Sequence, residues 1–200
     1  MVTRAHLPWL LGIVAVTLMI SACSDDPEFH SRDISGALPD LEFTLEQAPD
    51  EQMVSEADFE GKVVALFFGF THCPDYCPLT LAKFAGALDG IEEDLAQDMR
   101  VLFVSVDPER DTPEQLAQYV SGFGERFVGL RADRSTLRDV TRRYRTTFSY
   151  GDPDENGHYD VAHGTATFVF DRSGEVRFLA RDDAPVDELE HDLRLLLEGS

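Results

Sequence analysis

The chain has 200 residues, which is long enough for one hydrophobic core in addition to a leader segment. It contains 38 acidic and 17 basic residues, a formal net charge of −21. A surface with this charge repels phosphate groups, so the composition excludes DNA and RNA as partners.

The chain begins with the pattern of a membrane-targeting leader. Arg4 precedes residues 7–22, a run that is apolar and free of charge. This run is shorter than the roughly 20 residues that a transmembrane helix needs. It ends in Ile20-Ser21-Ala22-Cys23, which is similar to the lipobox of bacterial lipoproteins. We therefore expect cleavage before Cys23 and a lipid on its sulfur, with an uncleaved N-terminal anchor as the alternative.

These features predict how the chain is divided. Residues 1–22 form the signal peptide, residues 23–37 an acidic flexible tether, and residues 38–200 one folded domain. Either form of the leader attaches the domain to a membrane and leaves it on the outer side. The predicted location is the bacterial cell envelope, with the domain facing the periplasm or the outside.

The first part of the domain predicts a deeply buried strand. Residues 41–45 alternate apolar and polar side chains, as an edge strand does, and residues 57–61 have the composition of a turn. Residues 62–70 then form a continuous apolar run rich in valine and phenylalanine. Such a run is typical of a strand buried on both faces of a sheet.

Strands and helices alternate through the rest of the domain. Pro78 suits the first turn of a helix, Thr112 has the pattern of an N-cap followed by Pro113 and Gln115, and Ser135 is the expected cap of a later helix. The predicted helices are 79–97 (with a break at Gly90), 112–121, 135–144 and 187–197. The predicted strands are 101–106, 128–132, 165–170 and 176–180, with a loop at 151–157 and a hairpin turn at 171–174.

This order of elements predicts an α/β fold. Parallel units followed by an antiparallel hairpin give a central mixed β-sheet flanked by helices. Two cysteines, Cys73 and Cys77, follow the first buried strand directly and precede a helix. That placement is the thioredoxin arrangement, so we expect a thioredoxin-like fold.

The cysteine pair can serve several kinds of chemistry. Free N–H groups at a helix start stabilise thiolate, which is both a nucleophile and a soft metal ligand. The sequence between residues 71 and 78, THCPDYCP, separates the cysteines by three residues, which permits a disulfide and also a wider metal bite. Two thiolates and one imidazole suit copper, whereas structural zinc takes four ligands. A disulfide, a metal site and a redox couple all remain open at this point.

A third ligand must come from another part of the chain. His72 adjoins the cysteine pair, His158 lies in a polar loop and His191 on the last helix. His163 stands just before the predicted strand 165–170. In a thioredoxin-like sheet the loop that enters this strand comes beside the cysteine pair, which makes His163 the best candidate.

Three segments together resemble the Sco/SenC family, copper proteins linked to cytochrome c oxidase assembly. They are THCPDYCP at 71–78, VSVDPERDTP at 104–113, and the region of His163 before an apolar strand. The resemblance spans roughly residues 38–197. It implies that Cys73, Cys77 and His163 bind copper, as Cu(I) or Cu(II), and that the two cysteines can form a disulfide. It also implies a partner, the copper-site subunit of cytochrome c oxidase.

The chain departs from the family pattern beside the histidine. Many members have an aspartate before it and serine or threonine after it, whereas this chain has Ala162 and Gly164. Asp160 is a candidate substitute for the missing aspartate. The altered neighbours put the orientation of the imidazole in question more than its identity as a ligand.

Two functions from different classes follow from the sequence. The first is a copper metallochaperone that serves the dinuclear copper site of the oxidase. The alternative is a thiol-disulfide reductase that uses Cys73 and Cys77 on oxidase cysteines or in redox defence. A peroxidase is a weaker third hypothesis, because no peroxidatic signature surrounds Cys73. We interpret residues 107–111 mainly as a structural loop that leads into a helix, with docking as the minority hypothesis.

Overall fold

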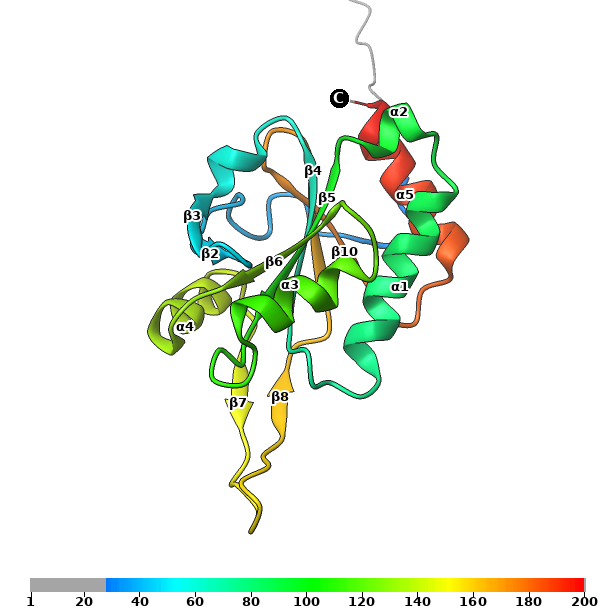
Figure 1. Ribbon diagram of the computed structural model, residues 1–200. Helices are drawn as coiled ribbons and strands as arrows, with labels where there is room; N and C mark the ends of the chain where they lie inside the picture. The colour runs from blue at the N-terminus through cyan, green and yellow to red at the C-terminus, as the bar shows by residue number, and fades with distance from the viewer. Residues whose placement is uncertain (1–27, 200) are drawn as a thin grey trace, which may run out of the picture.

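An eight-stranded mixed sheet organises the computed structural model, which describes residues 28–199. The strands lie in the order β1-β10-β9-β4-β5-β6-β2-β3 (Figure 1). Their bounds are β1 Arg32–Asp33, β2 Thr44–Gln47, β3 Gln52–Ser55, β4 Val63–Gly69, β5 Met99–Ser105, β6 Phe127–Arg131, β9 Thr167–Phe170 and β10 Val176–Ala180. Two further strands, β7 Phe148–Tyr150 and β8 Val161–His163, pair with each other in a separate ribbon.

Strand β4 is the centre of the sheet. Every one of its residues is buried. It pairs in parallel with β5 on one side and antiparallel with β9 on the other. A strand covered on both faces gains from apolar side chains at every position, which explains the unbroken run Val63–Gly69. The predicted buried strands at 62–70 and 101–106 are confirmed.

Helices cover the sheet on both sides. Figure 1 shows α1 and α5 side by side to the right of the sheet and α4 to its left. Their bounds are α1 Tyr76–Asp89, α2 Glu93–Ala96, α3 Pro113–Ser121, α4 Arg134–Arg143 and α5 Val186–Glu198, with a 3-10 turn, η1, at Glu56–Phe59. The core strand order β10-β9-β4-β5, with α1 linking β4 to β5 and α5 after the hairpin, confirms the thioredoxin-like α/β fold.

Some element boundaries differ from those expected. The strand expected at 41–45 is β2, Thr44–Gln47, and it lies inside β3 rather than at the edge. Helix α1 begins at Tyr76, so Pro78 is its third residue rather than a residue before the helix. The expected break at Gly90 is confirmed, because α1 ends at Asp89 and α2 covers Glu93–Ala96. Helix α4 is capped by Asp133, not Ser135, because the Asp133 carboxylate accepts hydrogen bonds from two backbone N–H groups of the first turn.

The cap of α3 is as predicted. Thr112 accepts a hydrogen bond from the backbone N–H of Gln115, and the Gln115 side chain accepts one in return from the backbone N–H of Thr112. Pro113 occupies the first helical position, where its missing N–H costs nothing. This capping box fixes the point at which the loop after β5 ends.

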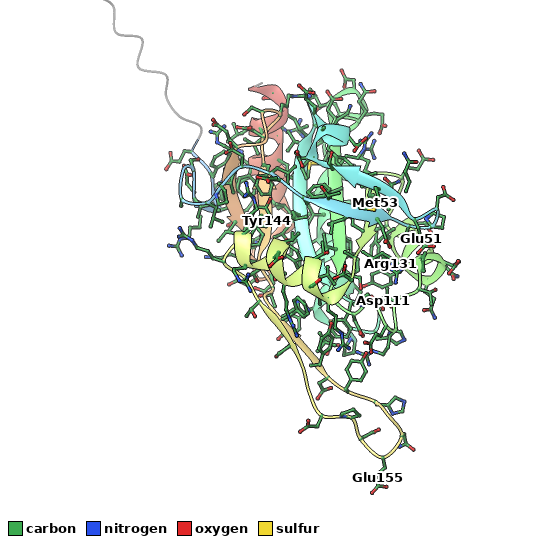
Figure 2. All side chains as sticks on the ribbon, turned by 90° about the vertical axis from the view of Figure 1, so that its left-hand side faces the viewer. Glu51, Met53, Asp111, Arg131, Tyr144 and Glu155 are labelled. Carbon is green, nitrogen blue, oxygen red and sulfur yellow. The ribbon has the colours of Figure 1, made fainter. Side chains whose placement is uncertain are left out.

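The ribbon of β7 and β8 is the feature that the sequence did not reveal. It projects beyond the sheet at the end where β4 ends, and Glu155 lies at its tip (Figures 1 and 2). The expected loop 151–157 is its turn. Each strand of the ribbon has only three residues, so neither carries enough alternation to be recognised alone.

The predicted leader, residues 1–22, and Cys23 lie outside the described residues and remain predictions. Part of the predicted tether 23–37 is in fact packed on the domain: Arg32–Asp33 form β1 against β10, and the backbone N–H groups of His30 and Ser31 donate to the buried carboxylate of Asp192. Within residues 28–199, none of the helices has the length and apolar character required to span a bilayer.

Candidate metal centre

Three soft or borderline ligand groups converge at the end of β4. The ligand atoms of Cys73, Cys77 and His163 all lie within 4.8 Å of one another. His163 Nε2 is 3.7 Å from Cys77 Sγ, and the backbone N–H of Cys77 donates to Cys73 Sγ over 3.5 Å. Among residues 28–199, this is the group of His, Cys, Asp or Glu side chains arranged closely enough to hold a metal ion.

Three separate elements bring these residues together. Cys73 lies in the loop after β4, where its N–H donates to the carbonyl of Phe70. Cys77 is the second residue of α1, and His163 is the last residue of β8. The hairpin ribbon thus carries the imidazole to the cysteine loop, because β8 leads directly toward β9, the neighbour of β4. The structure therefore brings together the three residues singled out in the sequence.

Burial controls the protonation of this group. The Cys77 side chain is fully buried and Cys73 is 9% exposed. Burial raises the pKa of the Cys77 thiol far above its ordinary value. The expected lowering of a thiol pKa by the helix start is thus outweighed at Cys77 by loss of solvent. Both cysteines are free thiols in the structure.

The His163 imidazole is held in its neutral form. Burial lowers the pKa of its imidazole. Its Nδ1 lies 2.9 Å from the carbonyl oxygen of Gly164, which can only accept, so Nδ1 carries the proton and Nε2 presents its lone pair toward Cys77. A backbone carbonyl thus fixes the tautomer that a carboxylate fixes in many metal sites. Asp160, the candidate substitute for that carboxylate, is exposed and has no hydrogen bond to His163 in the described structure.

Aromatic rings pack against His163, and a glycine leaves space for the sulfur of Cys77. The rings of Phe67 and Phe70 pack edge-on against the His163 imidazole, with centroids 6.1 and 5.7 Å away. A Cβ atom at Gly69 would lie 2.6 Å from the Phe103 ring and 2.8 Å from Cys77 Sγ. Glycine at the end of β4 is therefore required for the sulfur to reach its place.

A buried carboxylate, Asp111, supports the cysteine loop. It accepts hydrogen bonds from the backbone N–H and the hydroxyl of Thr71, at 2.9 and 2.6 Å, and from the hydroxyl of Ser105, at 2.6 Å. The His72 ring also lies 3.4 Å from it, so His72 faces this carboxylate and not the three-ligand group. Figure 2 labels Asp111 among the side chains below the helix α4. These contacts agree with the structural interpretation of residues 107–111.

Arg110 links the same loop to the ribbon. Its guanidinium lies 3.9 Å from the centroid of the Tyr159 ring and donates to the Tyr159 carbonyl oxygen over 3.0 Å. Asp107 accepts from both Arg110 and the Tyr159 hydroxyl, the latter at 2.7 Å. The ribbon that bears His163 is thereby tied to the loop that supports Cys73. No local pattern predicts this contact, because Tyr159 lies 49 residues after Arg110.

The other histidines within residues 28–199 stand apart from the group. His158 is exposed near the tip of the ribbon and approaches Asp154. His191 is exposed on α5, and its ring packs on that of His30 with centroids 4.7 Å apart. The donor set is therefore two thiols and one imidazole, which fits copper better than a four-ligand zinc site.

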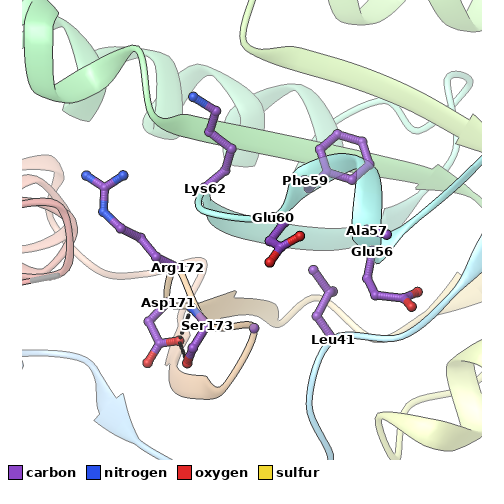
Figure 3. A pocket seen from close by; sticks show the side chains of 10 residues that line it. Leu41, Glu56, Ala57, Phe59, Glu60, Lys62, Asp171, Arg172 and Ser173 are labelled. Atoms are coloured by element: carbon purple, nitrogen blue, oxygen red, sulfur yellow. Dashed lines mark hydrogen bonds between the residues drawn. The ribbon is translucent and has the colours of Figure 1, made fainter.

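A separate pocket lies at the other end of β4, between η1 and the turn that joins β9 to β10 (Figure 3). Its lining includes Lys62 and Arg172. Both cations are already paired with Asp98, at 2.6 and 2.7 Å. This pocket holds no group of metal-ligating side chains and has no connection to the cysteine site.

Comparison with known proteins places the geometry in a family context. A sequence model of the family described as SCO1/SenC matches residues 35–198. The human "Protein SCO1 homolog, mitochondrial" is 39% identical over 122 residues, which cover 60% of this chain and 40% of that protein. The Arabidopsis thaliana "Protein SCO1 homolog 1, mitochondrial" is 38% identical over 130 residues, covering 65% and 38%. The matched region thus spans about two fifths of each of these relatives.

Solved structures match over a larger share of their length. Bradyrhizobium japonicum ScoI with copper bound is 30% identical with a TM-score of 0.70, covering 78% of this chain and 98% of that one. Apo Sco1 from Thermus thermophilus is 33% identical with a TM-score of 0.76, covering 84% and 97%. The solved structures therefore belong to the family that the sequence motifs indicated, and they share the predicted fold.

The comparisons contradict the predicted location. The curated relatives from human, Arabidopsis and cattle are named as mitochondrial proteins. On this finding the predicted bacterial cell-envelope location, with the domain facing the periplasm, is wrong. That prediction depended on a short pattern of small residues before Cys23, which lies outside the described residues and carries little information compared with the match over the domain.

Proposed function

Since the chain belongs to the SCO1/SenC family, we propose that it binds one copper ion through Cys73, Cys77 and His163. The observation that carries this proposal is the convergence of the three ligand atoms within 4.8 Å of one another. Two soft sulfur donors and a neutral imidazole form a set that copper accepts with few ligands. Copper-bound structures of ScoI from Bradyrhizobium japonicum and Arabidopsis thaliana support the choice of metal.

The proposed role is copper handling during assembly of the dinuclear copper site of cytochrome c oxidase. The family resemblance of the cysteine motif and of residues 104–113 supports this role. Thiolate ligands favour Cu(I), and binding requires that both thiols lose their protons. Because the Cys77 thiol resists ionisation when no metal is present, the bound cation supplies the charge that stabilises its thiolate.

Thiol-disulfide reduction is the second candidate function. It is favoured by the presence of two free thiols whose sulfur atoms lie within 4.8 Å. The more exposed Cys73 would attack a partner disulfide as thiolate and form a mixed disulfide. Cys77 would then lose its proton and displace the partner thiol, leaving a Cys73–Cys77 disulfide and a reduced partner. The high pKa of Cys77 makes this resolving step slower than in an ordinary redox pair.

A Cu(I) titration tests the copper proposal. The purified, reduced chain is titrated without oxygen against a competing Cu(I) chelator. We expect one tightly held copper, loss of that copper in Cys73→Ala, and affinity lowered by at least about tenfold in His163→Ala. His158→Ala is the matched control, because His158 is an exposed histidine on the same ribbon, and its affinity should equal that of the parent.

Two outcomes would contradict the proposal. Equal affinity in His163→Ala and the parent would exclude the three-ligand site. A chain that retains no copper but rapidly reduces a model disulfide, with that activity lost in Cys73→Ala, would favour the reductase function instead.

A further inference from the structure

Access to the three-ligand group is restricted to one side. Cys77 is fully buried, whereas Cys73 is 9% exposed and His163 is half-buried. Copper passes between proteins by ligand exchange, in which an incoming thiolate or imidazole bonds to the metal before the old ligands leave. An incoming donor can therefore reach the metal from the side of Cys73 and His163, and the partner that carries it must cover the surface beside them.

The first turn of α1, which begins three residues after Cys73, carries two exposed apolar side chains. Tyr76 is 56% exposed and Leu79 is 67% exposed. They are the first and fourth residues of α1, so they lie on the same face of its first turn. Tyr76 also stands between the two cysteine ligands in the sequence. Exposed large apolar groups are few in the described residues, and a pair of them next to a reactive group marks an interaction site.

The other border of the site is strongly acidic. The loop 151–160 of the ribbon exposes Asp152, Asp154, Glu155 and Asp160. The sequence contains no lysine or arginine between Arg145 and Arg172. Figure 1 shows this ribbon projecting at the same end of the molecule as the loop between β4 and α1, and Figure 2 shows Glu155 at its tip. A partner seated at the metal therefore meets a negative surface on the ribbon side.

We infer that Tyr76, Leu79 and the acidic loop 151–160 form a docking face for the protein that exchanges copper with this chain. The partner has an apolar contact near its own metal ligands and lysine or arginine side chains around it. The apolar pair would hold the complex together, since buried aromatic and aliphatic groups dominate affinity at interfaces. The acidic loop would speed the encounter, since peripheral charges act mainly on the association rate. This inference rests on the proposed copper function.

The test measures Cu(I) transfer from the loaded chain to a purified, soluble, metal-free copper-site domain of cytochrome c oxidase. Leu79→Ser, alone and with Tyr76→Ser, should leave copper affinity unchanged but lower the second-order transfer rate, by at least about tenfold for the double variant. Met53→Ser is the matched control. Met53 is 55% exposed and lies on β3, the strand at the edge of the sheet away from α1 (Figure 1).

Charge reversal tests the acidic loop separately. Asp152→Lys with Glu155→Lys should slow transfer and flatten its dependence on salt concentration. Asp94→Lys with Glu125→Lys makes the same change of charge at two residues that precede β5 and β6, at the end of the sheet opposite to the cysteine site. This control should have little effect on the transfer rate. Transfer to a small chelator needs no docking, so every variant should match the parent in that assay.

The outcomes separate this inference from the proposed function. If the chain fails to bind copper, the proposed function fails. If copper binds as in the parent but the Tyr76, Leu79 and loop variants transfer it to the oxidase domain at the parental rate, the docking face is overturned and the copper site stands.

Discussion

Asp111 shows how a single side chain supports the shape of the cysteine loop. Its carboxylate is fully buried, yet it accepts from Thr71 and Ser105, which reach it from the loop after β4 and from the end of β5. A buried carboxylate is tolerated only when it is surrounded by donors in this way. The loop geometry therefore depends on a residue that is not itself a ligand.

Replacement of Asp111 by alanine should destabilise the fold. The change removes the carboxylate that accepts from the N–H and hydroxyl of the partly buried Thr71 and from the hydroxyl of the fully buried Ser105, at a cost of roughly 3 kcal/mol in the free energy of unfolding. Denaturant unfolding of the reduced chain measures it. Glu114→Ala removes a nearby exposed carboxylate and should change stability by less than about 0.5 kcal/mol. Equal effects of the two substitutions would show that Asp111 has no special structural role.

Gly164 illustrates why this chain departs from its family pattern beside His163. A Cβ atom at position 164 would collide with the hydroxyl of Thr146. Thr146 thus occupies the space that a serine or threonine after the histidine would need. The Gly164 carbonyl supplies the hydrogen bond to the imidazole, so the missing aspartate at position 162 leaves no unpaired nitrogen at Nδ1.

The three residues of the proposed copper site could be chosen from the sequence, whereas the residues that support them could not. Cys73 and Cys77 are marked by their spacing after an apolar strand, and His163 by its place before another strand. Asp111 reaches Thr71 across 40 residues, and nothing in the local pattern distinguishes it from other acids that precede a helix. Such contacts arise from tertiary packing, which a single sequence does not encode in any periodic signal.

At the scale of elements, the ribbon of β7 and β8 depends for its stability on contacts with the rest of the fold. An isolated two-stranded ribbon is marginal in water. This one is fastened from its loop side, where Arg110 packs on Tyr159, just before β8, and Asp107 binds both. The position of the imidazole thus depends on a cation–π contact and a shared carboxylate.

Arg110→Ala should therefore loosen the ribbon without unfolding the sheet. We expect faster amide hydrogen exchange across residues 148–163 and copper affinity lowered by about tenfold, in the range seen when groups that orient metal ligands are removed. Tyr159→Phe keeps the ring under the guanidinium and should have a smaller effect. Arg142→Ala, which breaks an exposed pair with Asp139, is the control. Unchanged exchange in Arg110→Ala would rule out this role.

Element prediction succeeded where the local signal agreed with the tertiary environment. The runs at 62–70 and 101–106 are buried on both faces, and the capping box at Thr112 is a local interaction. The first-turn cap of α4 was misassigned because Asp133 and Ser135 are both good caps, and the choice depends on where the preceding strand β6 ends. The ribbon was missed because its strands are stable only against the rest of the molecule.

At the scale of the whole molecule, the two ends of the sheet carry different groups of side chains. The group formed by Cys73, Cys77 and His163 lies where β4 and β5 end. Where these strands begin, Asp98 binds Lys62, which precedes β4, and Arg172, which lies in the turn between β9 and β10. Figure 3 shows Lys62 and Arg172 at this end of the sheet. Hydrogen bonds from Lys62 and Arg172 lower the pKa of Asp98 to about 2.

This shift gives a pH dependence of stability with a definite sign. A carboxyl group whose pKa is lower in the folded chain than the value of about 3.9 in the unfolded chain stabilises the fold above that value. The stabilisation is lost as the pH falls toward 2. Asp98→Asn should lower the free energy of unfolding at pH 7 by less than about 1 kcal/mol, since the group is partly exposed. Urea unfolding should show this difference shrinking between about pH 4 and pH 2; a difference independent of pH would contradict it.

Fold and family were accessible from the sequence at this scale, but location was not. The arrangement of strands and helices follows from burial, which hydrophobic patterns report directly. A leader is instead read by a receptor or a processing enzyme, and its few residues do not take part in the packing that defines the family. The pattern around Cys23 consequently predicted a location that the relatives of the domain contradict.

Cys77 and His163 are separated by 86 residues of sequence. A copper ion bonded to both would act as a removable cross-link that closes this long loop, and it would bind the folded chain alone. At a free copper concentration a hundredfold above the dissociation constant, such a ligand adds about 2.7 kcal/mol to the stability of the fold. The loaded and empty chains would then differ in their lifetimes against proteolysis, so a protein that has delivered its metal becomes the shorter-lived form until it is refilled.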